Sequence, residues 1–252
     1  MESDPHYGPA LASLHHRHFG MIAREAAALL LAELGARGIA EGTVAELAVG
    51  SGILSRRLCD AGFAAWGVDV SPAMVELARA LVPEAELAVG SLWDAALPRC
   101  VAVAAVGEAL CYAADPRAGL DALGARLASI HAALEPGGIL IFDVAGPGRS
   151  GPEGARTRIW RHGDGIIVLD EREDSRASEL RRDLDVFAAV EPGLYRHGLE
   201  RHVLRLYAPE AVEARLREVG FVVQRRSSYG ETQLPGWHVF VATRGLGPSA
   251  AR

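Results

Sequence analysis

The fold of this chain is decided by the stretch Val44-Ala45-Glu46-Leu47-Ala48-Val49-Gly50-Ser51-Gly52 and, downstream of it, by Gly67-Val68-Asp69-Val70-Ser71. The first apolar run ends in a turn of small residues, and the second ends in a carboxylate. Glycine lets a backbone turn sharply and approach a ligand without a Cβ in the way. Amides at the start of the following helix donate hydrogen bonds, and the carboxylate after the second strand accepts both hydroxyls of a ribose. The pattern predicts the nucleoside-binding half of a doubly wound sheet.

Strands and helices alternate through the first 145 residues. The expected strands are Val44–Leu47, Ala64–Val68, Glu86–Val89, Cys100–Val106 and Ile139–Val144. Apolar residues at helical spacing lie between most of them, as in the stripe formed by Leu120, Leu123, Leu127, Ile130 and Leu134. Strands that alternate with helices form a parallel sheet with helices on both faces.

The pattern changes after residue 145. Residues 156–206 alternate apolar and charged side chains, and Asp164-Gly165 and Pro192-Gly193 are turn signals, so we expect two antiparallel hairpins. A helix and two strands then close the chain. The predicted fold class is therefore α/β, with a doubly wound, mostly parallel seven-stranded sheet whose last strand is antiparallel.

We expect one domain with four segments. Residues 1–38 form an N-terminal helical cap, 39–145 the cofactor-binding core, 146–206 an antiparallel β insertion after the fifth strand, and 207–252 the closing helix and two strands. The insertion is expected to serve as a lid or as a dimer edge, in a chain that is a monomer or a homodimer.

Composition narrows the function classes. The chain has 252 residues and a formal net charge of -6, which argues against a nucleic-acid partner because such affinity rests largely on neutralising phosphates. No apolar run approaches the roughly 20 residues of a membrane span, so we expect a cytoplasmic protein without a membrane partner. The absence of lysine excludes Schiff-base catalysis. The three cysteines have no CxxC spacing, so no metal site is expected.

Together with three later motifs, these stretches resemble the class I S-adenosylmethionine-dependent methyltransferases, specifically the small bacterial single-domain type. The later motifs are Gly90-Ser91-Leu92, Gly107-Glu108 and Leu134-Glu135-Pro136-Gly137-Gly138, each next to an expected strand. The resemblance covers roughly Thr43–Gly146 by motif and Tyr207–Ala242 by topology. It implies an enzyme that uses S-adenosyl-L-methionine to methylate an oxygen or nitrogen nucleophile of a small-molecule substrate.

The resemblance also implies which residues bind the cofactor. Glu46 would order the first turn or meet the methionine ammonium through water, and Asp69 would hold the ribose hydroxyls. The full expected set is Glu46, Ala48, Gly50, Gly52, Asp69, Val70, Ser91, Leu92, Val106 and Gly107.

Two of these positions depart from the family pattern. Ala48 stands where the family has its first glycine, and because alanine does not readily adopt positive φ, we expect an extended backbone there. Ser91 replaces an acidic residue, but its hydroxyl can still meet the adenine amine. Gly50 and Gly52 are retained.

Candidate residues for the acceptor lie near the N-terminus and after the fourth strand. Tyr7, Glu108 and Tyr112 are predicted to bind substrate. Glu108 and Tyr112 follow the fourth strand, and open α/β sheets bind ligands at the carboxyl ends of their strands, whereas Tyr7 offers an aromatic face to the cationic donor. Tyr112 is also a candidate catalytic residue. His15, His16 and His18 are candidate general bases, because histidine has an unperturbed pKa near ~6.5. His16 and His18 cannot both point inward from one helix. Catalysis is expected to rest mainly on alignment of donor and acceptor.

Other interpretations stay open. Gly50, Gly52 and a later acidic residue partly match the NAD-binding fingerprint of an oxidoreductase, although its third glycine falls at Ser55. A non-catalytic S-adenosylmethionine-binding protein, or an enzyme that uses the sulfonium for other chemistry, would carry the same motifs. The motifs identify the donor and leave the acceptor undefined.

Overall fold

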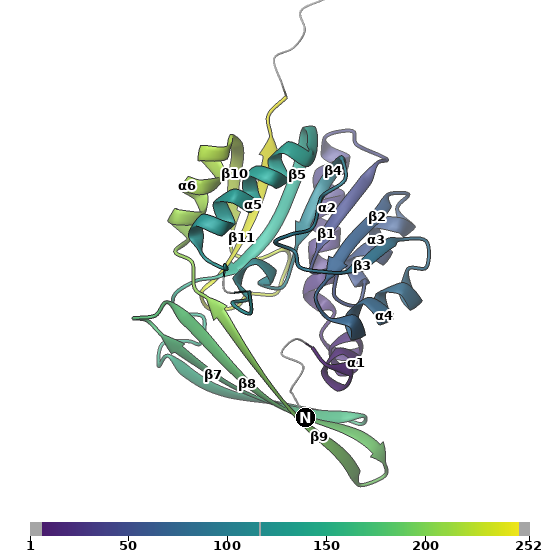
Figure 1. Ribbon diagram of the computed structural model, residues 1–252, viewed down its shortest axis with the longest axis vertical. Helices are drawn as coiled ribbons and strands as arrows, with labels where there is room; N and C mark the ends of the chain where they lie inside the picture. The colour runs from purple at the N-terminus through teal and green to yellow at the C-terminus, as the bar shows by residue number, and fades with distance from the viewer. Residues whose placement is uncertain (1–6, 116, 247–252) are drawn as a thin grey trace, which may run out of the picture.

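The computed structural model describes residues 7–115 and 117–246 (Figure 1). Residues 1–6 of the expected cap and 247–252 of the expected closing segment lie outside that part. Among the described residues, no helix has both the length and the apolar character needed to cross a membrane.

The first half of the chain alternates strands and helices after two N-terminal helices. The elements are α1 (Pro9–His18), α2 (Met21–Ala36), β1 (Thr43–Leu47), α3 (Ile53–Asp60), β2 (Ala64–Asp69), α4 (Pro72–Leu81), β3 (Glu86–Val89), β4 (Cys100–Ala105), the short 3-10 helix η1 (Ala109–Cys111), α5 (Leu120–Ala133) and β5 (Leu134–Ala145).

The second half adds four antiparallel strands and then returns to the main sheet. Its elements are β6 (Ala155–His162), β7 (Gly165–Asp174), β8 (Glu179–Glu191), β9 (Leu194–Arg205), α6 (Pro209–Val219), β10 (Phe221–Arg226) and β11 (Trp237–Arg244).

The main sheet has seven strands in the order β10-β11-β5-β4-β1-β2-β3. Strands β1 to β5 pair in parallel, whereas β11 runs antiparallel to both β5 and β10. The predicted fold class is thus confirmed. The sequence order reverses between β1 and β4, and in open α/β sheets this is the place where ligands bind.

Helices cover both faces of the main sheet (Figure 1). Leu30 and Leu34 of α2 pack with Val44 and Ala102 on one face, while Leu127 of α5 and Leu216 of α6 belong to the core on the other. Every residue of β4 is buried. The small residues of this central strand let helices approach from both sides.

Strand β5 begins five residues before the apolar run that predicts it. Leu134 pairs with Cys100, and the register then shifts so that Ile139 pairs with Ala102. The Glu135–Gly138 segment forms an irregularity within β5, because the residues on either side of this segment both pair with the central strand β4.

Strands β6 to β9 form a second, separate sheet, here called the inserted sheet (residues 155–205). The two expected hairpins are confirmed, and β7–β8 pairing joins them. Leu11 and Leu14 of α1 pack on one face of this sheet against Leu184 and Val186. Helix α1 therefore packs against both the inserted sheet and helix α4 (Figure 1).

The buried carboxylate of Asp143 organises the end of the main sheet where β4 and β5 stop. Its oxygens accept hydrogen bonds from the Gly107 and Glu108 amides at 2.8 and 2.7 Å. They also accept from the Tyr229 hydroxyl at 2.8 Å and from Trp237 Nε1 at 2.7 Å. Burial raises the pKa of Asp143 to about 6. The backbone after β4, which forms one wall of the site, is set by these bonds.

Candidate functional site

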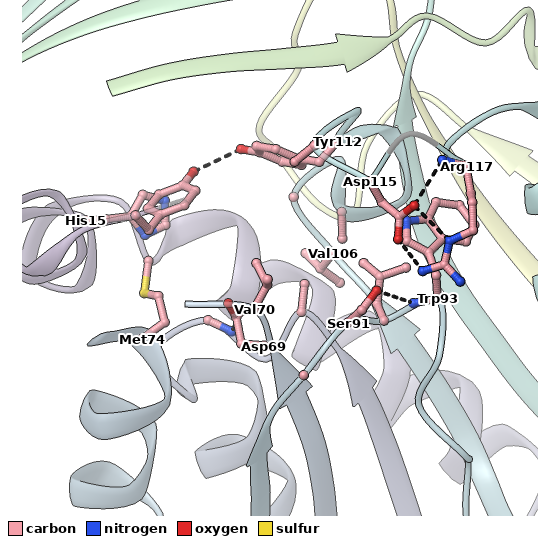
Figure 2. Close-up of a pocket in the computed structure, with 18 residues that line it drawn as sticks. His15, Asp69, Val70, Met74, Ser91, Trp93, Val106, Tyr112, Asp115 and Arg117 are labelled. Atoms are coloured by element: carbon pink, nitrogen blue, oxygen red, sulfur yellow. Dashed lines mark hydrogen bonds and ion pairs between the residues drawn. The ribbon is translucent and has the colours of Figure 1, made fainter. Parts of the chain in front are cut away.

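A cavity of about 620 Å³ lies at the carboxyl ends of the parallel strands. In Figure 2, His15 and Trp93 mark its opposite ends, and Asp69, Val70 and Val106 lie between them. Its lining residues are Tyr7, His15, Ala48, Gly50, Asp69, Val70, Met74, Gly90, Ser91, Leu92, Trp93, Val106, Gly107, Ala109, Tyr112, Ala114, Asp115 and Arg117.

Two glycines open the backbone to this cavity. Gly50 and Gly107 both have positive φ, at 54° and 83°, and a Cβ added to either would meet no atom within 4 Å. Gly52 differs, because a Cβ there would lie 3.1 Å from the backbone of Ala78 in α4. Gly50 and Gly107 thus give a ligand access to the backbone, whereas Gly52 lets two helices pack closely.

The expectation of an extended backbone at Ala48 is wrong. Ala48 has φ of 59°, in the left-handed region. The Val49 amide donates to the Val68 carbonyl at 2.9 Å, so pairing with β2 resumes two residues after β1 ends. That pairing, with the turn to Gly50, imposes the left-handed conformation on Ala48 although it is unfavourable for alanine.

Asp69 fits the role of ribose acceptor. One carboxylate oxygen accepts from the Gly50 amide at 2.8 Å and the other from the Ser71 amide at 2.9 Å. A carboxylate offers about four lone-pair sites, so roughly two remain for a diol. Burial raises the pKa of Asp69, and the amides of Ser71 and Gly50 oppose that rise. The side chain is therefore oriented before any ligand enters.

The remaining lining residues suit an adenine base. Val70 and Leu92 line the cavity with apolar surface, and the Val70 residue is half exposed. Ser91 accepts from the Trp93 amide at 3.1 Å, which leaves its own O–H free to donate toward a ligand. Val106 lines the cavity beside Gly107. A mostly apolar cavity with a few fixed polar groups is typical of cofactor sites.

Glu46 lies behind the cavity wall rather than in it. The residue is 4% exposed and accepts a hydrogen bond from the Ser55 hydroxyl of α3. Burial raises the pKa of Glu46 to about 8, although the Ser55 bond acts in the opposite direction. The structure thus connects Glu46 to the helix that follows the glycine turn.

The aromatic end of the cavity unites residues from distant parts of the chain. The hydroxyls of Tyr7 and Tyr112 lie 3.2 Å apart, and the His15 ring stands edge-on to Tyr7 with centroids 5.2 Å apart. Burial raises the pKa of both tyrosines, so both are neutral phenols. Burial, with help from His16 and His202, lowers the pKa of His15 to about 4. In Figure 2 the Tyr112 ring lies above the middle of the cavity, and its hydroxyl points toward the side where His15 lies.

Of the three candidate histidines, only His15 is among the residues that line the cavity. His18 points to the inserted sheet, where its Nε2 lies 2.8 Å from Asp164 and its ring stacks on His162. His16 has its Nδ1 buried without a hydrogen-bond partner in the described part of the chain. The three histidine rings of α1 therefore do not meet in the cavity.

Glu108 is placed away from the cavity. Its carboxylate pairs with Arg149 and with Arg182, the latter at 2.7 Å. Burial favours the neutral form, but the two guanidinium groups outweigh it and lower the pKa of Glu108 to about 2. Because this carboxylate is shared by two cations and Glu108 is not among the lining residues, the structure lends no support to the expected contact with substrate, which stays a prediction. The neighbouring Gly107 and Ala109 line the cavity instead.

Sequence reasoning missed Glu200 and His202, which come from β9. Glu200 accepts hydrogen bonds from the Tyr7 and Gly8 amides, both at 2.9 Å, and from His202 at 3.0 Å. The His202 ring packs against those of Tyr7 and Tyr112. The alternation of β9 places Glu200 and His202 on one face, but it does not say what that face meets.

Comparisons with known proteins identify the core. Residues 44–138 match the family model described as a methyltransferase domain. This segment carries the sequence pattern of a methyltransferase domain. The match agrees with the predicted class, an S-adenosylmethionine-dependent methyltransferase, and with the expectations of an enzyme and of S-adenosyl-L-methionine as cofactor. No curated protein sequence matches this chain.

Solved structures share the fold of the methyltransferase domain and of the insertion at low sequence identity. An S-adenosylmethionine-dependent methyltransferase from Clostridium acetobutylicum is 15% identical, with a TM-score of 0.78 over 92% of this chain and 98% of that one. The CcbJ methyltransferase from Streptomyces caelestis is 22% identical, with a TM-score of 0.76 over 97% and 100%. A sugar N-methyltransferase from a Streptoalloteichus species is 23% identical, with a TM-score of 0.72 over 97% and 98%.

The left-handed conformation of Ala48 predicts that Ala48→Gly stabilises the protein. Relief of about 1–2 kcal/mol of backbone strain, less about 0.4–1 kcal/mol for the more flexible unfolded chain, leaves a gain of about 0.5–1 kcal/mol. Urea denaturation measures it. The matched control is Ala88→Gly on β3, an exposed strand residue where glycine should destabilise. A loss of stability in both variants would contradict the strain argument.

Proposed function

We propose that this chain transfers the methyl group of S-adenosyl-L-methionine to an amine of a small molecule. The observation that carries the proposal is the aromatic end of the cavity. Its polar groups Tyr7, His15 and Tyr112 are all neutral at pH 7, and none has a pKa near 7. A hydroxyl acceptor needs a general base matched to the working pH, but a neutral amine supplies its own lone pair.

The cofactor would lie along the cavity with its nucleoside at Asp69 and its methionine part at the glycine wall. Asp69 has acceptor sites for the ribose, Ser91 and Leu92 flank the space for adenine, and Gly50 and Gly107 leave room beside the backbone. Bound there, it supplies an electrophilic methyl group on a sulfonium. The methyl would then face the end of the cavity that Tyr7, His15 and Tyr112 line.

The residues of the chain contribute alignment and exclusion of water. A positioned donor and acceptor can supply ~7–11 kcal/mol of the barrier. The aromatic faces of Tyr7 and Tyr112 can attract the cationic donor. The buried aromatic end also disfavours a protonated amine, so the acceptor enters with its lone pair available. Bound S-adenosyl-L-methionine would yield its methyl to the amine lone pair and keep the carbon–sulfur electron pair, and the proton of the product ammonium would pass to solvent.

The comparisons support a small-molecule acceptor. One structure of the same fold is described as a sugar N-methyltransferase, and amino sugars are therefore the first acceptors to screen. The net charge of -6 fits a small-molecule acceptor better than a polyanionic one.

We also propose that the inserted sheet acts as a lid support. Glu200 and His202 hold the Tyr7–Gly8 segment over the cavity, and the Ser71 hydroxyl donates to the Tyr7 carbonyl at 2.7 Å from the opposite side. The segment is thus fastened to the inserted sheet and to the start of α4 at once.

Cofactor binding can be measured without an acceptor. Titration calorimetry with S-adenosylhomocysteine should show binding by the wild type and at least about tenfold weaker binding by Asp69→Ala, because the diol loses charge-assisted hydrogen bonds. Asp121→Ala is the control, since the Asp121 side chain is 98% exposed on the surface. Equal affinity of the wild type and Asp69→Ala would refute the assignment of Asp69.

The nature of the acceptor can be tested with matched amino and hydroxy compounds, by measuring S-adenosylhomocysteine release. We expect turnover of the amino compounds and less than about a tenfold loss in His15→Phe, because a true general base contributes about 10²–10⁴-fold. His18→Phe is the control on the same helix. Faster turnover of hydroxy compounds, abolished in His15→Phe, would show instead that the enzyme methylates oxygen with His15 as base.

The lid proposal predicts faster proteolysis in Glu200→Gln. Loss of the charge-assisted bonds to the Tyr7 and Gly8 amides should raise the population of an open segment, and trypsin should cleave after Arg17 roughly tenfold faster. Mass spectrometry of the digest reports that cleavage. Glu153→Gln, at an exposed site before β6, is the control. Unchanged cleavage in Glu200→Gln would show that the inserted sheet does not restrain this segment.

A further inference from the structure

Ser91 provides a partner for only half of the adenine edge. It stands two positions after β3, where the family pattern has an acidic residue. The edge of adenine presents a ring nitrogen that accepts a hydrogen bond and an exocyclic amine that donates one. The Ser91 hydroxyl accepts from the Trp93 amide at 3.1 Å and has its own O–H to donate, so it suits the ring nitrogen. The amine calls for a second group, an acceptor.

Asp115 brings a carboxylate to the same cavity from another segment. It lies four residues after η1 and is one of the residues that line the cavity. Its side chain is 18% exposed. Figure 2 shows Asp115 near Ser91 and Trp93, at the end of the cavity opposite His15. This is the end at which the proposed placement of the cofactor puts the adenine.

The backbone on both sides of Asp115 is fixed. Before it, the Ala113 amide donates to the Val203 carbonyl of β9 at 2.8 Å. After it, the Ala118 amide donates to the Asp115 carbonyl at 2.9 Å. The position of this carboxylate in the cavity wall is therefore set by the protein before any ligand enters.

Arg117 orients the Asp115 carboxylate and keeps it charged. Oδ1 accepts from the Arg117 amide at 2.9 Å and from its Nε at 2.8 Å, and Oδ2 pairs with Nη2. Three of about four lone-pair sites are thus used, and one on Oδ2 remains. The guanidinium and the amide of Arg117 hold the pKa of Asp115 at about 2, so the group is an anion at pH 7. One acceptor site on an oriented anion matches one N–H of an amine.

Arg117 is itself held by Asp94, which follows β3. Nη1 and Nη2 of Arg117 donate to the two Asp94 oxygens at 2.6 and 2.9 Å. Both edges of the planar guanidinium therefore make two-point contacts with a carboxylate, a geometry that fixes direction as well as distance. Exposed ion pairs add little to stability. The main effect of this chain of charges is to aim Asp115 from the segment after η1.

We propose that Asp115 accepts a hydrogen bond from the exocyclic amine of the cofactor adenine, while Ser91 donates to the adjacent ring nitrogen. Arg117, held by Asp94, is the positioning residue for that carboxylate. The inference rests on the proposed placement of the cofactor and adds the group that selects adenine over a purine without the amine. An acidic residue from the segment after the fourth strand thus takes over the place of the one that Ser91 replaces after the third.

The test uses S-adenosylhomocysteine and its 6-deamino analogue, in which hydrogen replaces the exocyclic amine. Titration calorimetry gives the Kd of each ligand, and the ratio of the two Kd values measures recognition of the amine. The wild type is compared with Asp115→Ala, Asp115→Asn and Arg117→Met. Asp183→Ala is the control, because Asp183 is a 53% exposed carboxylate that pairs with Arg201 at 2.6 Å and is not among the lining residues.

We expect the wild type and Asp183→Ala to bind S-adenosylhomocysteine at least about tenfold more tightly than the analogue, because the analogue loses a hydrogen bond to a charged group. In Asp115→Ala the ratio should fall to about one, with the affinity for the analogue unchanged. Asp115→Asn keeps a neutral acceptor and should give about threefold, and it carries the comparison if Asp115→Ala does not fold. Arg117→Met should give a ratio between those of the wild type and Asp115→Ala.

An unchanged ratio in the Asp115 variants, with both ligands weakened equally, would show a purely structural role and overturn the proposal. An unchanged ratio in Arg117→Met would refute the positioning role of Arg117. A wild-type ratio of about one, together with weaker binding of S-adenosylhomocysteine by Asp69→Ala, would refute this inference and leave the proposed function standing. Absence of binding by the wild type would refute both.

Discussion

The four hydrogen bonds accepted by the buried carboxylate of Asp143 are the constraint on which the cofactor cavity depends. They join the end of β4, through the amides of Gly107 and Glu108, to Tyr229 and to Trp237 at the start of β11. Hydrogen bonds to a charged group contribute about 1.5–3 kcal/mol each, and a buried carboxylate without them would be far too costly. The carboxylate is tolerated in the core because all four donors converge on it. The same hydrogen bonds hold the backbone at Gly107 open toward the cavity.

A second set of buried charges ties the inserted sheet to the same region. Glu108 follows Gly107 directly, and its carboxylate is shared by Arg149 and Arg182. Arg182 of β8 also pairs with Glu171 of β7 at 2.8 Å. Buried ion pairs add little net stability, but they strongly disfavour any arrangement that leaves one partner alone. The segment between β4 and Tyr112 is therefore held between Asp143 on one side and the inserted sheet on the other.

Sequence reasoning succeeded where the physics is local. The glycine turn, the alternation of strands and helices before residue 145 and the alternation within β6 to β9 all depend on residues close together in the chain. Sequence reasoning did not anticipate the backbone of Ala48 or the ion pairs of Glu108, and the reason is the same for both. Intrinsic preference predicted an extended alanine, but pairing of Val49 with Val68 overrode it. A carboxylate after a strand end suggested a substrate contact, but in the structure two arginines from distant segments pair with that carboxylate.

By itself the sequence determined the fold class of the protein, because the spacing of glycines, strand-end carboxylate and apolar runs specifies a doubly wound sheet. Only the tertiary structure decided which side chains meet in the cavity. Tyr7 and Glu200 are 193 residues apart in the chain, yet one carboxylate of the inserted sheet positions the N-terminal aromatic. Short stretches of sequence determine local backbone preferences, whereas the packing of the whole chain determines the partners of a buried charge.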